Sequence, residues 1–276
     1  MDYTQTSTFL ACPERYRLRY LEKIRKIKEG DIEAPKRFGE AIHAALECKY
    51  TKQPLESALA AFAQIYPASL DPMDLSRTPE TGAALIRAYW NHYEEDASFE
   101  ILDVEKVLEH PLNGFKWQAK VDAVVRTAGG IWGLEHKTTG KTFSEFYWKS
   151  FEPNSQLSGQ SWLIQKAYGQ CSGIIVNALK MGFRKRAYKG EVAGFHYDFQ
   201  RQRFNRTPQQ IQDWMARMTK TMQRIESLEP TDVWEKHEGQ CGWCEYRELC
   251  LSCGDEQVKD VLYEPYNSYA YLEEGT

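Results

Sequence analysis

The feature that most constrains this chain is the segment KVDAVVRTAGGIWGLEHKT at residues 120–138. Two stretches rich in β-branched and aromatic residues, Val121–Arg126 and Ile131–His136, flank a short glycine-containing stretch at Thr127–Gly130. That pattern is typical of a β-hairpin. Apolar residues alternate along the first strand, so we expect one face of the hairpin to be buried. The chain must therefore fold around at least one half-buried pair of antiparallel strands.

Charged side chains on this hairpin indicate a metal site. Pairing about the turn places Asp122 opposite Glu135, because both lie the same number of residues from its centre. Side chains alternate along a strand, so Glu135 and Lys137 share one face while His136 points to the other. Two carboxylates that face each other across a ladder repel unless a positive charge lies between them. A divalent cation held by carboxylate oxygens meets that requirement. The simpler alternative is a surface hairpin with solvated charges.

A histidine upstream is a candidate third ligand. His43 ends the motif GEAIH at residues 39–43, four residues after a glycine that permits close backbone approach. A lone histidine on a helix is more often a core or surface residue than a ligand. Together with Asp122 and Glu135, however, His43 completes a set of one imidazole and two carboxylates.

Composition limits the class of protein. The chain has 276 residues, of which 42% are hydrophobic and 27% are charged, so wholesale disorder is excluded. No run approaches the roughly 18 apolar residues of a membrane span, and the N-terminal sequence has no apolar leader, so we expect a cytoplasmic protein. The net charge of −4 argues against a protein that coats nucleic acid through bulk charge. A nucleic-acid site must therefore be a local patch.

The hydrophobic period changes along the chain from helical to strand-like. The first thirty residues predict a helix capped by Thr6 or Ser7. Further helices are expected at Phe38–Tyr50, Leu55–Tyr66, Pro79–Asp96 with Thr78 as its cap, Gln156–Tyr168 and Pro208–Leu228. Strands are expected at Phe99–Leu108, Phe115–Arg126, Ile131–Lys137, Gly173–Leu179 and Val192–Phe199, with a turn at His110–Gly114. One α/β unit with helical additions is the economical interpretation.

The order of these motifs resembles the RecB-type branch of the PD-(D/E)XK nuclease superfamily over most of the chain. The matching elements are GxxxH at Gly39–His43, the aspartate Asp122, ExK at Glu135–Lys137, and QxxxY, which begins at Gln156 and ends here in Gln160. The resemblance implies an α/β fold with a restriction-endonuclease-like core, in which helices flank a mixed central sheet. It also implies N-terminal helical insertions and a C-terminal iron–sulfur segment.

The resemblance implies a single nuclease domain over residues 1–276. Residues 1–98 would form an N-terminal helical part that carries Cys12 and GxxxH, and residues 99–200 would form the nuclease core. Residues 201–276 would supply a helix and a cysteine cluster that closes onto the N-terminus.

The resemblance also implies roles for single residues. His43, Asp122, Glu135 and the backbone carbonyl of His136 would bind the catalytic metal. Lys137 would orient or activate the attacking water, and Gln156 would support that lysine or the substrate. Glu105, on the preceding strand, is a weaker candidate that we do not select. Phosphodiester hydrolysis needs an activated water and positive charge at the transition state, which a divalent ion and a lysine supply. An imidazole ligand suggests that Mn²⁺ is accepted at least as well as Mg²⁺.

Cysteine spacing predicts a second metal centre. Cys241, Cys244 and Cys250 form a CxxC motif followed five residues later by a third cysteine. The fourth ligand is either Cys253, which would give a compact zinc site, or Cys12. The pairing of an N-terminal Cys-Pro with this C-terminal pattern resembles the iron–sulfur staple of AddB-type and CRISPR-adaptation RecB-like nucleases. That resemblance implies a [4Fe–4S] cluster held by Cys12, Cys241, Cys244 and Cys250.

Basic residues gather in one stretch without an acidic residue among them. They are Lys180, Arg184, Lys185, Arg186 and Lys189. Such a run is usually a solvated face, but beside a nuclease centre it becomes a candidate surface for tracking phosphates. Tyr147 and Trp148 are candidates to stack on bases.

These observations favour one function. We expect a metal-dependent DNA nuclease, most simply an exonuclease that acts on DNA ends or single-stranded DNA. It resembles stand-alone nucleases of phages and of CRISPR adaptation, because no helicase motif accompanies the nuclease motifs. The contrasting interpretation is an iron–sulfur-stabilised DNA-binding or assembly subunit of a recombination or CRISPR-adaptation complex, with weak or no activity. The implied partners are DNA and the proteins of such complexes, without a membrane.

Overall fold

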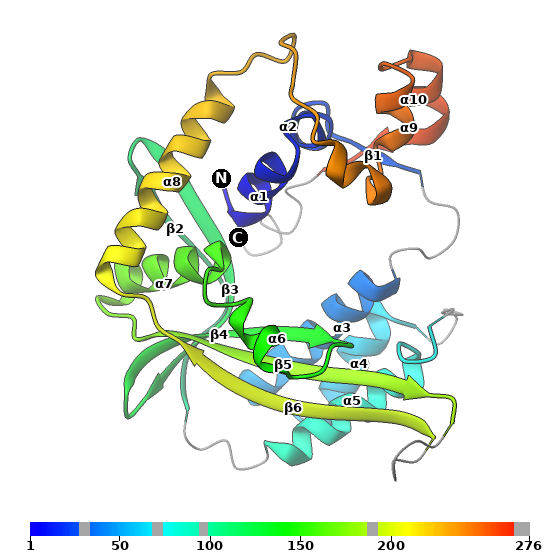
Figure 1. The fold of residues 1–276 in the computed structure, drawn as a ribbon. Coiled ribbons are helices and arrows are strands. Elements are labelled where there is room, and N and C mark those ends of the chain that lie inside the picture. Colours follow the sequence, from blue (N-terminus) through cyan, green and yellow to red (C-terminus); the bar gives the residue numbers. More distant parts are fainter. Residues whose placement is uncertain (28–33, 68–73, 94–98, 187–192, 268–276) are drawn as a thin grey trace. The chain divides into compact units, whose positions relative to one another are not determined.

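The computed structural model describes residues 1–27, 34–67, 74–93, 99–186 and 193–267 (Figure 1). The chain divides into two compact units, each assembled from segments that are distant in the sequence. The first unit contains residues 1–29, 109–119 and 208–276, and the second contains residues 30–108 and 120–207. The candidate hairpin therefore lies in the second unit, and the cysteine pattern lies in the first.

A mixed β-sheet forms the centre of the second unit (Figure 1). Among the described residues it has five strands in the order β2-β3-β4-β5-β6. The strands are β2 (Glu100–Leu112), β3 (Phe115–Thr127), β4 (Gly130–Thr139), β5 (Gly173–Arg184) and β6 (Gly194–Phe204). β4 and β5 run parallel, whereas β4 pairs antiparallel with β3, and β5 pairs antiparallel with β6. The predicted α/β class with a mixed central sheet is confirmed.

β3 and β4 form the hairpin that the sequence predicts. Their register pairs Ala123 with Leu134, so the next two residues in this register are Asp122 and Glu135. Gly130 follows the turn with a φ of 105°, a backbone conformation that favours glycine. The local pattern of turn and strand residues thus positions both carboxylates at one end of the ladder.

The β2–β3 hairpin turns more tightly than the sequence analysis predicts. β2 continues through the expected turn to Leu112, and only Asn113 and Gly114 connect the strands. Both connecting residues have positive φ, 49° and 93°, as a type I′ Asn-Gly turn requires. Pro111 is tolerated inside β2 because β2 is an edge strand of the sheet. The predicted turn segment 110–114 therefore contains the turn, but residues 110–112 belong to β2.

Helices cover both faces of the sheet. On one face lie α3 (Ala34–Tyr50), α4 (Leu55–Ile65) and α5 (Pro79–His92). Two more helices, α6 (Glu145–Lys149) and α7 (Ser155–Tyr168), follow β4 in the sequence. The helices α3, α4 and α5 share one buried core with Leu134 and Ile175 of the sheet. α7 packs on the opposite face of β4 and β5. A Cβ on Gly133 would lie 2.8 Å from the Cδ1 atom of Ile164 in α7, so the sheet and this helix approach closely.

The N-terminal segment is not the single helix that the sequence analysis predicts with a cap at residue 6 or 7. Asp2 caps α1 (Tyr3–Ala11), because its side chain accepts a hydrogen bond of 2.8 Å from the backbone nitrogen of Gln5. Cys12 then has extended backbone, as the residue before a proline prefers, and α1 ends. The helix α2 (Pro13–Tyr16) and the π-helical turn η1 (Arg17–Leu21) follow.

The first unit brings together the two ends of the described chain. β1 (Ile24–Lys26) pairs antiparallel with β7 (Tyr263–Pro265). The C-terminal part of the first unit contains α8 (Pro208–Glu226), the 3₁₀ turn η2 (Glu238–Trp243), α9 (Arg247–Leu251) and α10 (Glu256–Leu262). Tyr16 packs against Trp234, and Leu18 packs with Tyr246. None of the described helices has the length and apolar character that a membrane span requires.

Candidate active site

Three side chains that can bind a metal ion converge in the second unit. His43 of α3, Glu105 of β2 and Asp122 of β3 each place one ligand atom within 4.8 Å of the other two. Asp122 is buried, whereas the His43 side chain is 31% exposed, so the group can be reached from solvent on its histidine side. The structure thus brings two of the predicted ligands, His43 and Asp122, together and adds Glu105, the weaker candidate from the sequence.

Asp122 is the most firmly held carboxylate of the group. Its Oδ2 accepts a hydrogen bond of 2.7 Å from the backbone nitrogen of His136, and its Oδ1 lies 3.4 Å from Nδ1 of His43. Burial raises the pKa of Asp122, but the charge of His43 and the His136 N–H outweigh burial and hold that pKa below its usual range. Asp122 is therefore ionised at neutral pH.

The other two members of the group respond to the charge of Asp122. Burial disfavours the imidazolium form of His43, but the Asp122 carboxylate outweighs burial and raises the pKa of His43 to about 9. Burial and repulsion by Asp122 raise the pKa of Glu105, and Lys120, whose Nζ lies 2.9 Å from the Glu105 carboxylate, opposes that shift. A protonated His43 thus balances part of the negative charge, and a bound dication would replace its proton.

The backbone of Glu105 departs from ordinary strand geometry. Its φ is 50°, in the left-handed region, inside a strand that is otherwise extended. For a residue other than glycine this conformation costs roughly 1–2 kcal/mol, and strain of this kind clusters at functional sites. A local irregularity in a strand redirects a side chain. The signal available from the sequence was the position of Glu105 on the strand that neighbours the strand of Asp122.

Glu135 is almost fully buried, and both of its carboxylate oxygens accept hydrogen bonds. Oε1 accepts from Nζ of Lys137 at 2.5 Å and from Nε2 of Gln156 at 2.7 Å. Oε2 accepts from Nε2 of Gln160 at 2.6 Å, and Lys137 also donates to Oε1 of Gln156 at 3.1 Å. These contacts fix the ammonium and the carboxylate relative to each other. The Glu135 carboxylate does not belong to the three-residue group described above, so its role as a metal ligand stays a prediction.

The ring of His136 is buried and packs against His43, one of the candidate ligands. It stacks on Tyr50 at 5.3 Å between ring centroids and packs edge-on against His43 at 5.8 Å. Nε of Arg201 donates to Oδ1 of Asn177 at 3.0 Å, which directs the Asn177 amide nitrogen to Nδ1 of His136 at 2.8 Å. An amide nitrogen only donates, so Nδ1 accepts. Burial lowers the pKa of His136 to about 3, and the ring stays neutral. The ligand role of its carbonyl remains a prediction.

The donor set fits a divalent cation. With His43 neutral, the carboxylates of Glu105 and Asp122 bring two negative charges to one point. A cation between these carboxylates would relieve the repulsion that raises the pKa of Glu105. Carboxylate oxygens suit Mg²⁺, and the imidazole also admits Mn²⁺.

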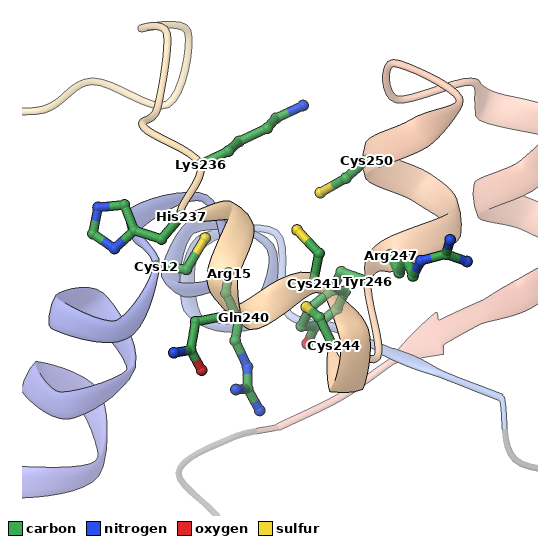
Figure 2. Close-up of a pocket in the computed structure, with 10 residues that line it drawn as sticks. All are labelled: Cys12, Arg15, Lys236, His237, Gln240, Cys241, Cys244, Tyr246, Arg247 and Cys250. Carbon is green, nitrogen blue, oxygen red and sulfur yellow. The ribbon is translucent and has the colours of Figure 1, made fainter.

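The four cysteines predicted to hold a cluster line one pocket of the first unit (Figure 2). The pocket is bordered by Cys12, Cys241, Cys244 and Cys250, and by the basic side chains of Arg15, Lys236 and Arg247. Cys253, the alternative fourth ligand, is exposed and borders a neighbouring pocket. Within the described ranges, no three cysteine sulfur atoms all lie within 4.8 Å of one another, so the predicted iron–sulfur cluster is not confirmed.

The predicted DNA-binding stretch lies at the C-terminal end of β5. Lys180 and Arg184 are half-buried residues of this strand, and Lys185 and Arg186 follow it with exposed side chains. Lys189 lies outside the described residues. Contact of these side chains with DNA remains a prediction.

The predicted stacking role of Tyr147 is wrong, because its ring is buried. Tyr147 lies on α6 and is 8% exposed, and its neighbour Trp148 is half-buried. Phe146, on the same helix, is 86% exposed. The sequence pattern did not show which side of this short helix faces the protein.

Comparisons with known proteins agree with this architecture. A family model described as the PD-(D/E)XK nuclease superfamily matches residues 3–251. No curated protein matches the sequence. Among solved structures, a candidate exonuclease from Eubacterium rectale matches at 12% identity and a TM-score of 0.55, over 92% of this chain and 93% of that one. At this identity the similarity shows the fold alone.

Two further solved structures are similar over a large part of the chain. SSO0001 matches at 14% identity over 79% of this chain and 94% of its own, with a TM-score of 0.33. LHK-Exo in complex with dAMP matches at 13% identity over 70% of this chain and 93% of its own, also with a TM-score of 0.33. Both TM-scores are too low to carry an argument about this chain.

Proposed function

Because this chain belongs to the PD-(D/E)XK nuclease superfamily, we propose that it is a metal-dependent deoxyribonuclease that removes nucleotides from DNA ends or single strands. The observation that carries the proposal is the grouping of His43, Glu105 and Asp122 in the same unit as the hydrogen-bonded pair Glu135 and Lys137. The first group suits a divalent cation, and the second offers a fixed positive charge to a phosphate. The exonuclease mode is the expectation from the sequence motifs.

His43, Glu105 and Asp122 would hold the divalent ion. When bound, the ion lowers the pKa of a water molecule and offsets negative charge on the phosphate. Glu135 holds Lys137 in place through the 2.5 Å contact, and Gln156 holds it through a second contact of 3.1 Å. The Lys137 side chain is 33% exposed, so a phosphate group can reach its ammonium. Lys137 would orient the attacking water and stabilise the charge that develops on the phosphate.

End-labelled DNA tests this function directly. Single-stranded and duplex substrates are incubated with the purified chain and Mn²⁺ or Mg²⁺. We expect shortening of the labelled strand that stops in EDTA and that falls by about a hundredfold or more in Asp122→Asn and Lys137→Met. Asp213→Asn and Lys149→Met remove exposed charges of the same types and should retain activity. Undiminished cleavage by Asp122→Asn would contradict the proposal. Cutting of covalently closed circular DNA would contradict the exonuclease mode.

We further propose that Cys12, Cys241, Cys244 and Cys250 hold a [4Fe–4S] cluster in the first unit. Support comes from the pocket that all four line (Figure 2). Burial raises the pKa of the Cys250 thiol to about 11, and the neighbouring Cys244 and Cys12 add to that shift. A bound metal centre would replace the protons of these thiols, because the thiolate is the form that binds metal.

Metal analysis after anaerobic purification tests the cluster. We expect about four iron atoms and four acid-labile sulfides per chain, with a broad visible absorbance that oxidation bleaches. Cys12→Ser and Cys250→Ser should lose the iron, whereas Cys253→Ser should retain it, because Cys253 is exposed and lies outside the pocket. Stoichiometric zinc without iron, or iron loss in Cys253→Ser alone, would contradict this assignment.

A further inference from the structure

Three polar side chains form a row across the central sheet of the second unit. His136, Asn177 and Arg201 are direct partners in the registers of β4 with β5 and of β5 with β6. Side chains that are paired in register lie on the same face of a sheet. Nε of Arg201 donates to Oδ1 of Asn177 at 3.0 Å, and the Asn177 amide nitrogen donates to Nδ1 of His136 at 2.8 Å. The Arg201 guanidinium is therefore linked to the His136 ring through one side chain.

Arg201 is also linked to the helix that carries His43. Its Nη2 donates to the hydroxyl oxygens of Tyr50 in α3 and Tyr89 in α5, at 3.0 and 3.1 Å. The Tyr89 hydroxyl also accepts from the Asn177 amide at 2.9 Å. Because both of its lone pairs are then occupied, it donates its own proton to the Tyr50 hydroxyl at 2.7 Å. Tyr50 follows His43 by seven residues on α3, about two helical turns, so both side chains lie on one face of the helix.

These two sets of contacts meet at His43. The ring of Tyr50 stacks on the ring of His136, with centroids 5.3 Å apart and 20° between the planes. The His136 ring packs edge-on against His43 at 5.8 Å, and Nδ1 of His43 lies 3.4 Å from the Asp122 carboxylate. Partners outside a ligand group hold the ligands in the orientation that binds metal. Both sets of contacts from Arg201 therefore act on the placement of the same candidate ligand.

The network is polar in a place where apolar packing would suffice to hold a helix on a sheet. Four of its side chains are nearly or fully buried, namely Tyr50, Tyr89, His136 and Asn177. Buried polar groups destabilise a protein unless they are hydrogen-bonded, but a satisfied network makes the arrangement rigid and unique. The guanidinium is fixed further by the ring of Tyr93, whose centroid lies 3.7 Å away. What the network adds to packing is one defined orientation of the rings beside the candidate metal site.

We propose that Arg201 is a positioning residue of the candidate metal site. Through Asn177 and Tyr50 it fixes the imidazole of His43 relative to the carboxylate ligands. This inference rests on the proposed function, because the ion is the one that the nuclease would use. Arg201 touches neither the ion nor the DNA. Its replacement should change which ion is preferred, because an imidazole ligand suits Mn²⁺ better than Mg²⁺, which takes oxygen ligands.

Arg201→Lys tests this role. Lysine keeps the charge but lacks the planar fork that reaches several partners at once. Dissociation constants for Mn²⁺ and Mg²⁺ are measured by calorimetric titration of the purified chain, at a temperature where circular dichroism shows that both proteins are folded. We expect the affinity for Mn²⁺ to fall about tenfold, and the affinity for Mg²⁺ to fall less. Arg203→Lys is the matched control, because Arg203 lies on the same strand with an exposed side chain over Trp132, and it should keep both constants.

Combination with His43→Ala makes the test specific. If Arg201 acts through His43, Arg201→Lys should change neither constant further in a chain that lacks the imidazole. A purely structural role would lower the melting temperature of the metal-free chain and leave the ratio of Mn²⁺ affinity to Mg²⁺ affinity unchanged. That result, or additive losses in the double variant, would overturn the inference.

Tyr50→Phe provides a second, milder variant. It keeps the ring that stacks on His136 and removes the hydroxyl that Arg201 contacts, so it should fold even if Arg201→Lys does not. The ratio of Mn²⁺ to Mg²⁺ affinity should fall in the same direction, and an unchanged ratio would count against the inference. Metal binding is measured without DNA, so a wild-type chain that binds Mn²⁺ but does not cleave contradicts the nuclease function alone. A wild-type chain that binds neither ion would overturn this inference as well.

Discussion

Glu105→Gln is the sharpest test of the metal centre, because the structure includes Glu105 where the sequence motifs favour Glu135. Glu105 supplies one of three ligand atoms that lie within 4.8 Å of one another and one of the two negative charges among them. Glutamine has nearly the same shape, so packing around β2 is retained. The substitution removes the 2.9 Å contact between Lys120 and Glu105, an ion pair that is partly exposed and worth at most about 1 kcal/mol. The apo protein should therefore remain folded.

The size of the metal effect follows from mass action. Replacing even an outer-shell partner of a metal ligand weakens binding about 10–100-fold, so loss of a direct ligand is expected at about a hundredfold. A metal present at about 100 times its Kd stabilises the folded state by about 2.7 kcal/mol, and after a hundredfold loss of affinity only about 0.4 kcal/mol remains. For a unit of this size each kcal/mol corresponds to roughly 2–4 °C. The metal-induced rise in Tm should therefore shrink by about 5–9 °C.

Differential scanning fluorimetry with and without Mn²⁺ measures this difference. Glu100→Gln, which removes an exposed carboxylate from the same strand, should respond to Mn²⁺ as the wild type does. A wild-type response in Glu105→Gln would refute the assignment of Glu105. If Glu135→Gln loses the response while Glu105→Gln keeps it, the ligand set implied by the sequence motifs is the correct one.

Three further predictions follow from other contacts. Replacing both Lys185 and Arg186 with alanine should weaken DNA binding and make the slope of log K against log salt shallower by about 1.4–1.8. Anisotropy titrations at several salt concentrations measure this slope. An unchanged slope would assign both side chains to solvated surface that does not contact DNA. Gln160→Leu removes the hydrogen bond of 2.6 Å that Gln160 donates to the buried Glu135 carboxylate. The free energy of unfolding, measured by urea titration, should fall by about 2 kcal/mol. Equal urea midpoints for the variant and the wild type would contradict that contact. Burial opposes ionisation of Glu22, but Lys259 at 2.8 Å and a neighbouring arginine hold its pKa below the usual value. The stability gained is therefore present above about pH 4.5 and lost as pH falls through the lowered pKa. Glu22→Gln should be less stable than wild type near pH 7, and the difference between them should shrink as the solution is acidified.

The hairpin was predictable because its determinants are local. The turn at Thr127–Gly130 and the alternation of apolar residues fix the register of β3 and β4. Continued by one residue beyond the Ala123–Leu134 pair, this register sets Asp122 across from Glu135. The α5 helix was predictable for the same reason, since Thr78 accepts a hydrogen bond at its first turn. Elements of this kind are determined by residues that are close in the sequence, so they can be predicted without knowing the distant contacts.

Features that depend on tertiary contacts were not predictable. Glu105 joins His43 and Asp122 through a backbone φ of 50°, a value that no sequence period reveals. Tyr147 and Phe146 are neighbours on one short helix, yet packing buries the first and exposes the second. Gln160, which replaces the tyrosine of the motif, donates to Glu135 instead, and only the structure identifies that contact.

The pairing of β1 with β7 has a consequence for how the protein is made. Tyr16 packs against Trp234 and Ile24 pairs with Pro265, so these two side chains find their partners only after more than 200 further residues have been made. At roughly 5–20 residues per second, these early apolar side chains wait for ten seconds or more. If synthesis stops before residue 234, these apolar side chains therefore remain exposed, and we expect chaperones to retain the incomplete chain.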